Sequence, residues 1–426
     1  MRKILFTFFI SVMFLIPSST FAAPVNPAFV DEEFYKCVVD NYNSNNNENY
    51  EYDINLTDEE LNTIERLNCS NSKYKVTYVT GLNKLENLTY MDINNFDIDT
   101  IDVSNNKKLT FLSVTESNIT SIDVSNNLEL TSLQLHNNKL TTIDVSKNTK
   151  LELLNLYGNP ITSIDVSNNK NLESLDLISA KLTTIDVSKN TELTTLRVYG
   201  TMNSIDVSNN QKLTWLEVNA NLTGIDLSNN KELKELELSM NDLTEIDLSN
   251  NIKLKDVCLT YNQLTEDSIK LPKSIESLGI FANDIETIDL REYPNLNALY
   301  LWGLSKNKNT TVILNPGVTI KSYYKTNLFT DSTDSEVVSV NNNQFTTLKE
   351  GTSTLTTLRS TTEGKLVVIV EEQEIMEDRE DIETPKNENN VENPKTGTYE
   401  QYALIISLII LVLGTYSFVK IKNTKN

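Results

Sequence analysis

Hydrophobic and polar residues follow one another in a fixed order over about half of the chain. A hexapeptide of the form Ile-Asp-(Val/Leu)-Ser-(Asn/Lys)-Asn occurs eight times, beginning at Ile101, Ile122, Ile143, Ile164, Ile185, Ile205, Ile225 and Ile246. Successive copies lie 20 or 21 residues apart. A constant interval of this length is typical of one turn of a solenoid, in which each repeat stacks on its neighbours.

The apolar positions of one repeat predict a short strand and a shared core. Counted from the hexapeptide isoleucine as position 0, apolar residues recur at positions 0, 2, 8, 11, 13 and 18, with asparagine usually at position 16. Positions 11 and 13 alternate as in a strand, so their side chains point to one face, which only stacked turns can bury. The asparagine at position 16 is expected to satisfy backbone groups where the chain leaves the strand. The Asn-Asn pair that ends the hexapeptide is expected to turn the chain in left-handed geometry.

Positions 8 to 18 read L-x-x-L-x-L-x-x-N-x-L, which resembles the signature of leucine-rich repeats. The resemblance covers residues 80–304, or about eleven turns when degenerate copies at both ends are included. It implies a leucine-rich repeat solenoid of short parallel strands. Because 21 residues leave little room for a helix, the back of each turn is expected to be mostly non-helical.

Residues 24–79 are expected to cap the open N-terminal end of the solenoid. The segment PAFVDEEFYKCVVDNY (27–42) has amphipathic helical spacing, and TDEELNTIERL (57–67) begins with a capping box from Thr57 to Glu60. Such helical caps resemble those that precede the repeats of internalin-type surface proteins. Cys37 and Cys69 are candidates for a disulfide across this cap, a bond feasible outside the cell, and the alternative is two buried free thiols.

After Trp302 the repeat pattern stops. Residues 308–371 alternate with period two between turn signals, which predicts a small β-sandwich. Within them, VVSVNNNQFTTLKEGTSTLTT (337–357) resembles the second half of bacterial immunoglobulin-like domains of group 2, so an Ig-like β-domain is expected. Residues 372–392 form an acidic, polar linker that is too poor in apolar residues to fold around a core.

The first 23 residues predict export. Two basic residues, an apolar run and a small-residue segment follow one another in the order of a signal peptide, with cleavage expected after Ala22 or Ala23. A helix of the mature fold is the alternative interpretation.

The other end of the chain predicts attachment to the cell surface. The pentapeptide Asn-Pro-Lys-Thr-Gly (393–397) precedes an apolar segment (402–419) and a basic tail (420–426). This order resembles the sorting signal of sortase substrates in Gram-positive bacteria. The resemblance implies cleavage between Thr396 and Gly397 and transfer of the Thr396 carbonyl to peptidoglycan, although Asn393 stands where the commonest signal has leucine. A plain single-span membrane anchor is the alternative.

Charge and composition narrow the chemistry. A formal net charge of -22 argues against nucleic acid and anionic lipid as partners. The single histidine, His136, falls at an interchangeable repeat position, and no catalytic motif or cofactor-binding loop is present, so we predict no catalytic residue, no enzyme activity and no cofactor. Cys258 is expected to be exposed because of its repeat position, and a reactive thiol is an alternative interpretation of it.

An aspartate at position 1 recurs in every hexapeptide. Stacked carboxylates would repel one another unless each accepts hydrogen bonds from turn amides. Calcium binding is the other interpretation, but the loops lack glycine-bearing calcium patterns, so we predict a structural role and no metal site.

Side chains at positions 10, 12 and 14 should face away from the core and line a concave surface. Aromatic residues beside acidic ones on such a surface are typical of protein-recognition hot spots, although aromatic side chains can also merely shield the strands. The predicted ligand-binding residues are Tyr90, Asp92, Phe111, Tyr157, Asp176, Arg197, Tyr199, Trp215, Glu217, Glu237, Phe281, Tyr300 and Trp302.

Taken together, the sequence predicts an exported, wall-anchored, monomeric and internalin-like protein. Its expected partners are a protein or glycan ligand, such as a host receptor, together with sortase and peptidoglycan. It would act as an adhesin or host-interaction factor. A structural protein that organises the bacterial wall is the first alternative, and an enzyme acting on the wall is the second.

Overall fold

The computed structural model describes residues 26–70, 73–300, 309–322, 329–341, 343–357 and 365–372. The chain divides into two compact units, residues 1–237 and 238–426. The predicted signal peptide, nearly all of the predicted linker, the sorting motif, the apolar segment and the basic tail lie outside the described residues. Within the described ranges, no helix has both the length and the apolar character needed to cross a membrane.

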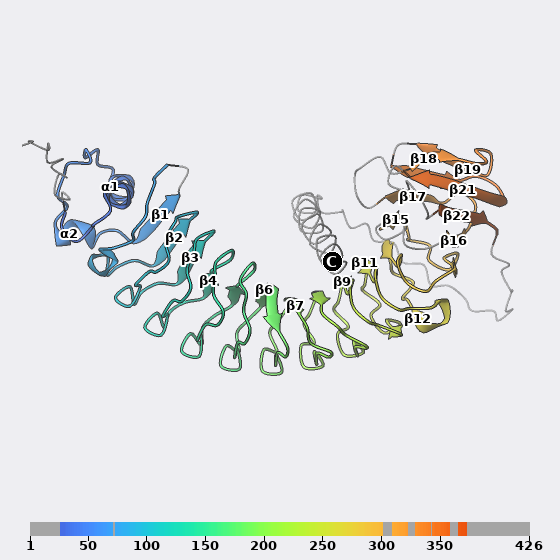
Figure 1. Ribbon diagram of the computed structural model, residues 1–426, viewed down its shortest axis with the longest axis horizontal. Coiled ribbons are helices and arrows are strands. Elements are labelled where there is room, and N and C mark those ends of the chain that lie inside the picture. Colours follow the sequence, from blue (N-terminus) through green and yellow to red (C-terminus); the bar gives the residue numbers. More distant parts are fainter. Residues whose placement is uncertain are drawn as a thin grey trace, which may run out of the picture. The chain divides into compact units, whose positions relative to one another are not determined.

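A parallel sheet built from one strand per repeat dominates the first unit (Figure 1). Its strands pair in chain order and keep the same repeat position opposite one another: Leu133 pairs with Leu112 on one side and with Leu154 on the other. The strands are β1 (Arg66–Ser70), β2 (Tyr90–Asn94), β3 (Phe111–Thr115), β4 (Ser132–Gln134), β5 (Leu153–Asn155), β6 (Ser174–Leu182), β7 (Thr195–Gly200), β8 (Trp215–Asn219) and β9 (Glu235–Glu237). This arrangement confirms the leucine-rich repeat solenoid.

The apolar positions of the repeat form its core. In the turn that begins at Ile122, five side chains have no exposed surface: Val124, Leu130, Leu133, Leu135 and Leu140. The isoleucine at position 0 is less deeply buried, since Ile122 and Ile164 are only half-buried.

The second asparagine of the hexapeptide, at position 5, is fully buried. In Asn148, Nδ2 donates to the carbonyl oxygens of Val124 at 3.0 Å and Asn127 at 2.9 Å, both in the preceding turn. The predicted left-handed geometry of the Asn-Asn pair is wrong, because the described left-handed residues of the repeats stand at position 15, as in Glu116 and Asn137. An inward amide that bonds the preceding turn fixes this corner without a left-handed residue.

A second asparagine ladder, at position 16, does what the sequence predicts. Asn138 Nδ2 donates to the carbonyl oxygens of Val114 at 2.7 Å and Leu135 at 3.0 Å, and its Oδ1 accepts from the Ile119 amide at 3.1 Å. The same pattern recurs at Asn159, Asn262 and Asn283. The buried amide therefore satisfies backbone groups of two successive turns.

Two helices precede the sheet, α1 (Glu32–Asn46) and α2 (Asp58–Leu61), and the predicted capping box of Thr57 and Glu60 is present in α2. The predicted helical segment 57–67 is nevertheless too long, because α2 ends at Leu61 and Arg66–Ser70 forms β1. The buried and exposed residues of β1 alternate with period two, which suits a strand. The solenoid consequently starts inside the predicted cap and has about twelve turns rather than eleven.

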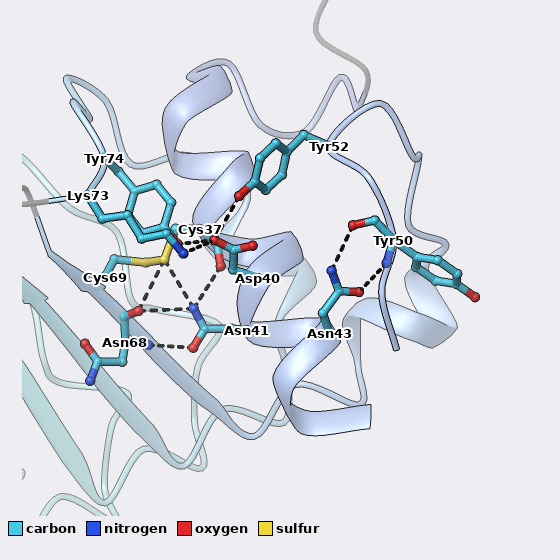
Figure 2. A network of polar contacts seen from close by, with 10 residues as sticks. All are labelled: Cys37, Asp40, Asn41, Asn43, Tyr50, Tyr52, Asn68, Cys69, Lys73 and Tyr74. Atoms are coloured by element: carbon cyan, nitrogen blue, oxygen red, sulfur yellow. Dashed lines mark hydrogen bonds and ion pairs between the residues drawn. A yellow bond between two sulfur atoms is a disulfide. The ribbon is translucent and has the colours of Figure 1, made fainter. Parts of the chain in front are cut away.

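Helix α1 lies along the outer edge of β1, and the two are joined covalently (Figure 2). A disulfide links Cys37 of α1 to Cys69 of β1, the pairing that the sequence had left open against two free thiols. One turn further along α1, the Asn41 side chain donates to the Asn68 carbonyl at 3.1 Å and accepts from the Asn68 amide at 3.0 Å. These bonds occupy backbone groups of an edge strand that would otherwise be open to another chain.

The second unit begins with further repeat strands. In it, β10 (Ile246–Asp247) pairs with β12 (Ile269–Lys270), and the chain-ordered series continues through β11 (Asp256–Cys258), β13 (Ser277–Gly279) and β15 (Ala298–Leu299). Short 3-10 turns occur in both units, η1 (Leu82–Lys84) and η2 (Glu266–Ser268).

The strands after the repeats extend the solenoid instead of standing apart from it. β17 (Thr319–Ser322) pairs in parallel with β15, and β16 (Asn309–Leu314) pairs in parallel with β14 (Thr287–Asp289). The remaining strands add to these two sheets by antiparallel and parallel pairing: β18 (Phe329–Ser332), β19 (Val338–Asn341), β20 (Gln344–Thr347), β21 (Gly351–Thr357) and β22 (Lys365–Val370). The sequence predicted strands in this region but not their continuity with the repeats.

Candidate functional site

Positions 10, 12 and 14 of strands β1–β9 form one surface, which we call the strand face. In β2 the residues at these positions are half-buried, whereas Met91 and Ile93 between them are fully buried. Within the first unit the strands follow the inner side of the curve (Figure 1), as the sequence predicted for this surface. Core positions repeat from turn to turn, but the residues of the strand face change, so this is where the chain varies.

At the N-terminal end of the strand face, three planar groups stack in register. Arg66, Tyr90 and Phe111 occupy position 10 of β1, β2 and β3 and stand directly opposite one another. The rings of Tyr90 and Phe111 are parallel within 6° with centroids 4.4 Å apart, and the Arg66 guanidinium lies 3.8 Å from the Tyr90 centroid. Stacked rings and a cation over a ring both stabilise such a row.

At the middle of the strand face lies a buried ion cluster. Position 12 of β6, β7 and β8 is occupied in turn by Asp176, Arg197 and Glu217, paired in register. Arg197 donates to Asp176 at 2.7 Å and to Glu217 at 2.8 Å, and its guanidinium lies 4.8 Å from the Trp215 ring. The Tyr199 hydroxyl donates to the second Glu217 oxygen at 2.8 Å. One cation is therefore held between two carboxylates.

Burial dominates the electrostatics of this cluster. Desolvation raises the pKa of Asp176 despite the neighbouring Arg197 guanidinium. Desolvation and the Glu217 carboxylate raise the pKa of Tyr199, which therefore stays protonated and donates. The pKa of Arg197 is raised, because the two carboxylates outweigh its burial. With two acids against one base, the cluster carries a net negative charge.

Several predicted ligand-binding residues are not water-facing. Asp176 and Glu217 are buried, at 8% and 4% exposure, because Arg197 engages both carboxylates. In the second unit, Phe281 and Tyr300 are buried because the sheet continues beyond their turns into the C-terminal strands. Cys258, expected to be exposed, is buried too. Cys258 pairs with Gly279 on the next strand, and because glycine has no side chain, Cys258 is not separated from Tyr300 on the strand beyond.

The other predicted residues divide between the first unit and the undescribed part of the chain. Tyr90, Asp92, Phe111, Tyr157, Arg197, Tyr199, Trp215 and Glu237 are half-buried on the strand face. Trp302 lies outside the described residues, as do Thr396 and Gly397.

The position-1 aspartates have the structural role that the sequence favoured. Asp123 Oδ1 accepts from the Ser125 amide at 2.8 Å, and Asp144 accepts from the Ser146 amide at 2.9 Å. Hydrogen bonds from the serine hydroxyl and amide lower the pKa of Asp123. No group of three or more potential metal ligands occurs within the described ranges.

Sequence reasoning missed Arg66 and the lengthening of the central strands. Arg66 stands 24 residues before Tyr90, outside the regular interval, and so was assigned to the cap. At position 16 the asparagine is replaced by Ala180 and Thr201 in two consecutive turns, and there β6 and β7 extend to nine and six residues. The missing asparagine was the available signal, because without its side chain the strand need not end early.

No family model matches the chain, and no curated protein matches it. Solved structures do. An internalin from Listeria monocytogenes is 21% identical, with 66% of this chain and 92% of that chain covered at a TM-score of 0.52. A leucine-rich repeat protein from Leptospira interrogans is 22% identical, with 64% and 76% covered at a TM-score of 0.51. The functional domain of InlJ from Listeria monocytogenes is 21% identical, with 82% and 98% covered at a TM-score of 0.47. The first two likenesses show the leucine-rich repeat fold.

Proposed function

We propose that this chain is a surface-attached recognition protein that binds a protein ligand on the strand face. The observation that carries the proposal is the contrast between constant core positions and a strand face whose residues change from turn to turn. A scaffold with no ligand would need only the constant core positions. The aromatic row and the charged cluster supply the residue types that dominate protein-binding hot spots.

The internalin-like interpretation extends to the ends of the fold. α1 and the Cys37–Cys69 disulfide would cap the first turn and keep the edge of β1 from pairing with another chain. Residues 308–371, the Ig-like β-domain expected from the sequence, would act as a spacer that continues from the last repeat strands. A glycan is the second ligand class, since aromatic rings that are partly open to solvent can also stack on sugars.

Attachment to the wall rests on the sequence alone. The pentapeptide 393–397, the apolar segment 402–419 and the basic tail support sortase processing between Thr396 and Gly397. Mass spectrometry of wall digests should find the Thr396 carboxyl end joined to a peptidoglycan amine. A chain recovered intact from the membrane fraction would instead support a single-span anchor.

A pull-down distinguishes an adhesin from a wall-organising protein. The immobilised full chain is incubated with host-cell extract and, separately, with isolated bacterial walls. An adhesin should retain a host protein, and Tyr157→Ala or Trp215→Ala on the strand face should weaken that retention. Leu128→Ala is the control, because Leu128 is 51% exposed but lies at position 6, away from the strands.

Three results would count against the proposal. Retention by walls alone would favour the structural alternative. Turnover of peptidoglycan by the chain would favour the enzyme. Retention that is unaffected by both strand-face variants would remove this surface as the binding site.

A further inference from the structure

We propose that the strand face contains a slot for one arginine side chain of the partner protein, between Phe111 and Leu153 and above Ser132. This inference rests on the proposed function and specifies the chemistry of the ligand. The site lies where the row of stacked planar groups ends, at Phe111.

The row at position 10 runs Arg66, Tyr90, Phe111, Ser132 and Leu153 on five consecutive strands. One face of Phe111 is covered by Tyr90 at 4.4 Å. Its other face is directed along the row toward Ser132, and among the described residues no ring or cation stacks on it. Ser132 has the shortest polar side chain available and cannot cover a ring.

Strand spacing sets the width of this slot. Neighbouring strands lie about 4.8 Å apart, so Phe111 and Leu153 are separated by roughly 10 Å across the Ser132 strand. A single planar group at about 4 Å from the Phe111 ring fits between them. The Ser132 hydroxyl below it offers a hydrogen-bond acceptor.

The charges around the slot favour a cation over a neutral ring. Asp92, at position 12 of β2, and Glu116, just after β3, both act electrostatically on His136, which stands at position 14, four residues after Ser132 on the same side of the chain. Burial lowers the pKa of His136, so it is neutral at pH 7 and does not repel a cation. Among side chains that are fully charged at pH 7, lysine and arginine carry the positive charge, and only the guanidinium of arginine is planar.

The chain itself shows the same contact at the opposite end of the row. Arg66 lies 3.8 Å from the Tyr90 centroid, and Tyr90 stacks on Phe111. An arginine from the partner would repeat this contact on the free face of Phe111. The completed row would then have a guanidinium at each end and two rings between them.

The test measures binding of short peptides to the full chain by surface plasmon resonance. The probe is acetyl-Gly-Arg-Gly-amide, compared with the same peptide containing citrulline, lysine or tyrosine in place of arginine. Citrulline has the shape of arginine without its charge, and lysine has the charge without the plane. We expect the arginine peptide to bind most tightly, by at least about fivefold, which is the size of a partly desolvated cation–π contact.

Two substitutions localise the binding. Ser132→Leu fills the slot with the side chain already present at Leu153, and should weaken the arginine peptide at least about fivefold. Ser174→Leu is the matched control, because Ser174 holds position 10 of β6 between Leu153 and Thr195, where no ring is available. It should leave binding unchanged.

Three results would contradict the arginine slot or its assignment. Equal binding of the tyrosine peptide, sensitive to Ser132→Leu, would show a slot for any planar group and overturn the assignment of arginine. Binding of a chito-oligosaccharide in place of all four peptides would assign the slot to a glycan. If Ser132→Leu leaves the pull-down ligand bound while Tyr157→Ala releases it, the slot is refuted and the proposed function stands.

Discussion

The two asparagines that end each hexapeptide should differ sharply in their contribution to stability. In the turn that begins at Ile164 they are Asn168, which is exposed, and Asn169, which is fully buried. Asn169 Nδ2 donates to the carbonyl oxygens of Val145 at 3.0 Å and Asn148 at 2.8 Å. Replacing Asn169 by alanine removes both bonds and leaves Asn168 in place.

The magnitude follows from these contacts. Two buried hydrogen bonds contribute ~1 kcal/mol each. The Asn169 Oδ1 atom is buried with no donor among the described residues, which is unfavourable. Removing this atom is therefore favourable and offsets part of the free energy lost with the two hydrogen bonds. We therefore expect Asn169→Ala to lower the free energy of unfolding by about 1–2 kcal/mol. Asn169→Asp should cost more, about 3–5 kcal/mol at neutral pH, because a buried carboxylate would face two carbonyl oxygens.

Urea unfolding followed by circular dichroism measures these differences. Asn168→Ala is the control and should change the free energy of unfolding by less than ~0.5 kcal/mol, as exposed substitutions usually do. The stability of Asn169→Asp should recover partly as the pH falls, since protonation removes the buried charge. Equal losses for the two alanine variants would show that the buried amide of Asn169 does not hold this corner of the turn, as would an aspartate variant no less stable than the alanine variant.

Other predictions concern charge and the disulfide. Arg197→Met should lower the free energy of unfolding by about 3–5 kcal/mol, because it leaves the buried carboxylates of Asp176 and Glu217 without their cation. Adding Asp176→Asn and Glu217→Gln to this variant should restore part of the loss. Urea unfolding measures the free energy of both variants. Reduction of Cys37–Cys69, which are 32 residues apart, should cost about 3–4 kcal/mol by release of the closed loop, and a Cys37→Ala and Cys69→Ala variant should no longer respond to reductant. The position-1 aspartates have folded pKa values below their unfolded value of about 3.9, so their contribution is present above that pH and is lost as the pH falls below it. The thermal midpoint should therefore be level above about pH 5 and fall below about pH 4, and a midpoint that rises in acid would contradict these hydrogen bonds.

The periodic part of the fold could be predicted from the sequence because each turn repeats the same apolar and asparagine positions. Leucines at positions 8, 11 and 13 have one way to be buried together, and the position-16 asparagine marks the end of the strand. The boundaries were harder. Arg66–Ser70 looked helical beside a capping box, yet it is the first strand, since Leu67 and Cys69 must face the core.

The strand face was predicted in position but not in chemistry. Repeat spacing placed Asp176, Arg197 and Glu217 on one surface, but it did not show that Arg197 pairs with both carboxylates, which depends on side-chain contacts across three strands. Nor could spacing show that Phe281 and Tyr300 are buried, because that depends on strands that follow in the chain. The residue pattern of a single repeat does not show which other segments of the chain will pack against that repeat.

The most direct test of recognition by the strand face is hydroxyl-radical footprinting of the full chain, with and without the ligand that it retains from host-cell extract. We expect the ligand to lower oxidation of Tyr90, Phe111 and Tyr157 on the strand face. Leu128, 51% exposed on the turn side of the repeat, should be oxidised to the same extent in both samples. Protection of Leu128 with no change at the three aromatic residues would show that the ligand does not bind the strand face.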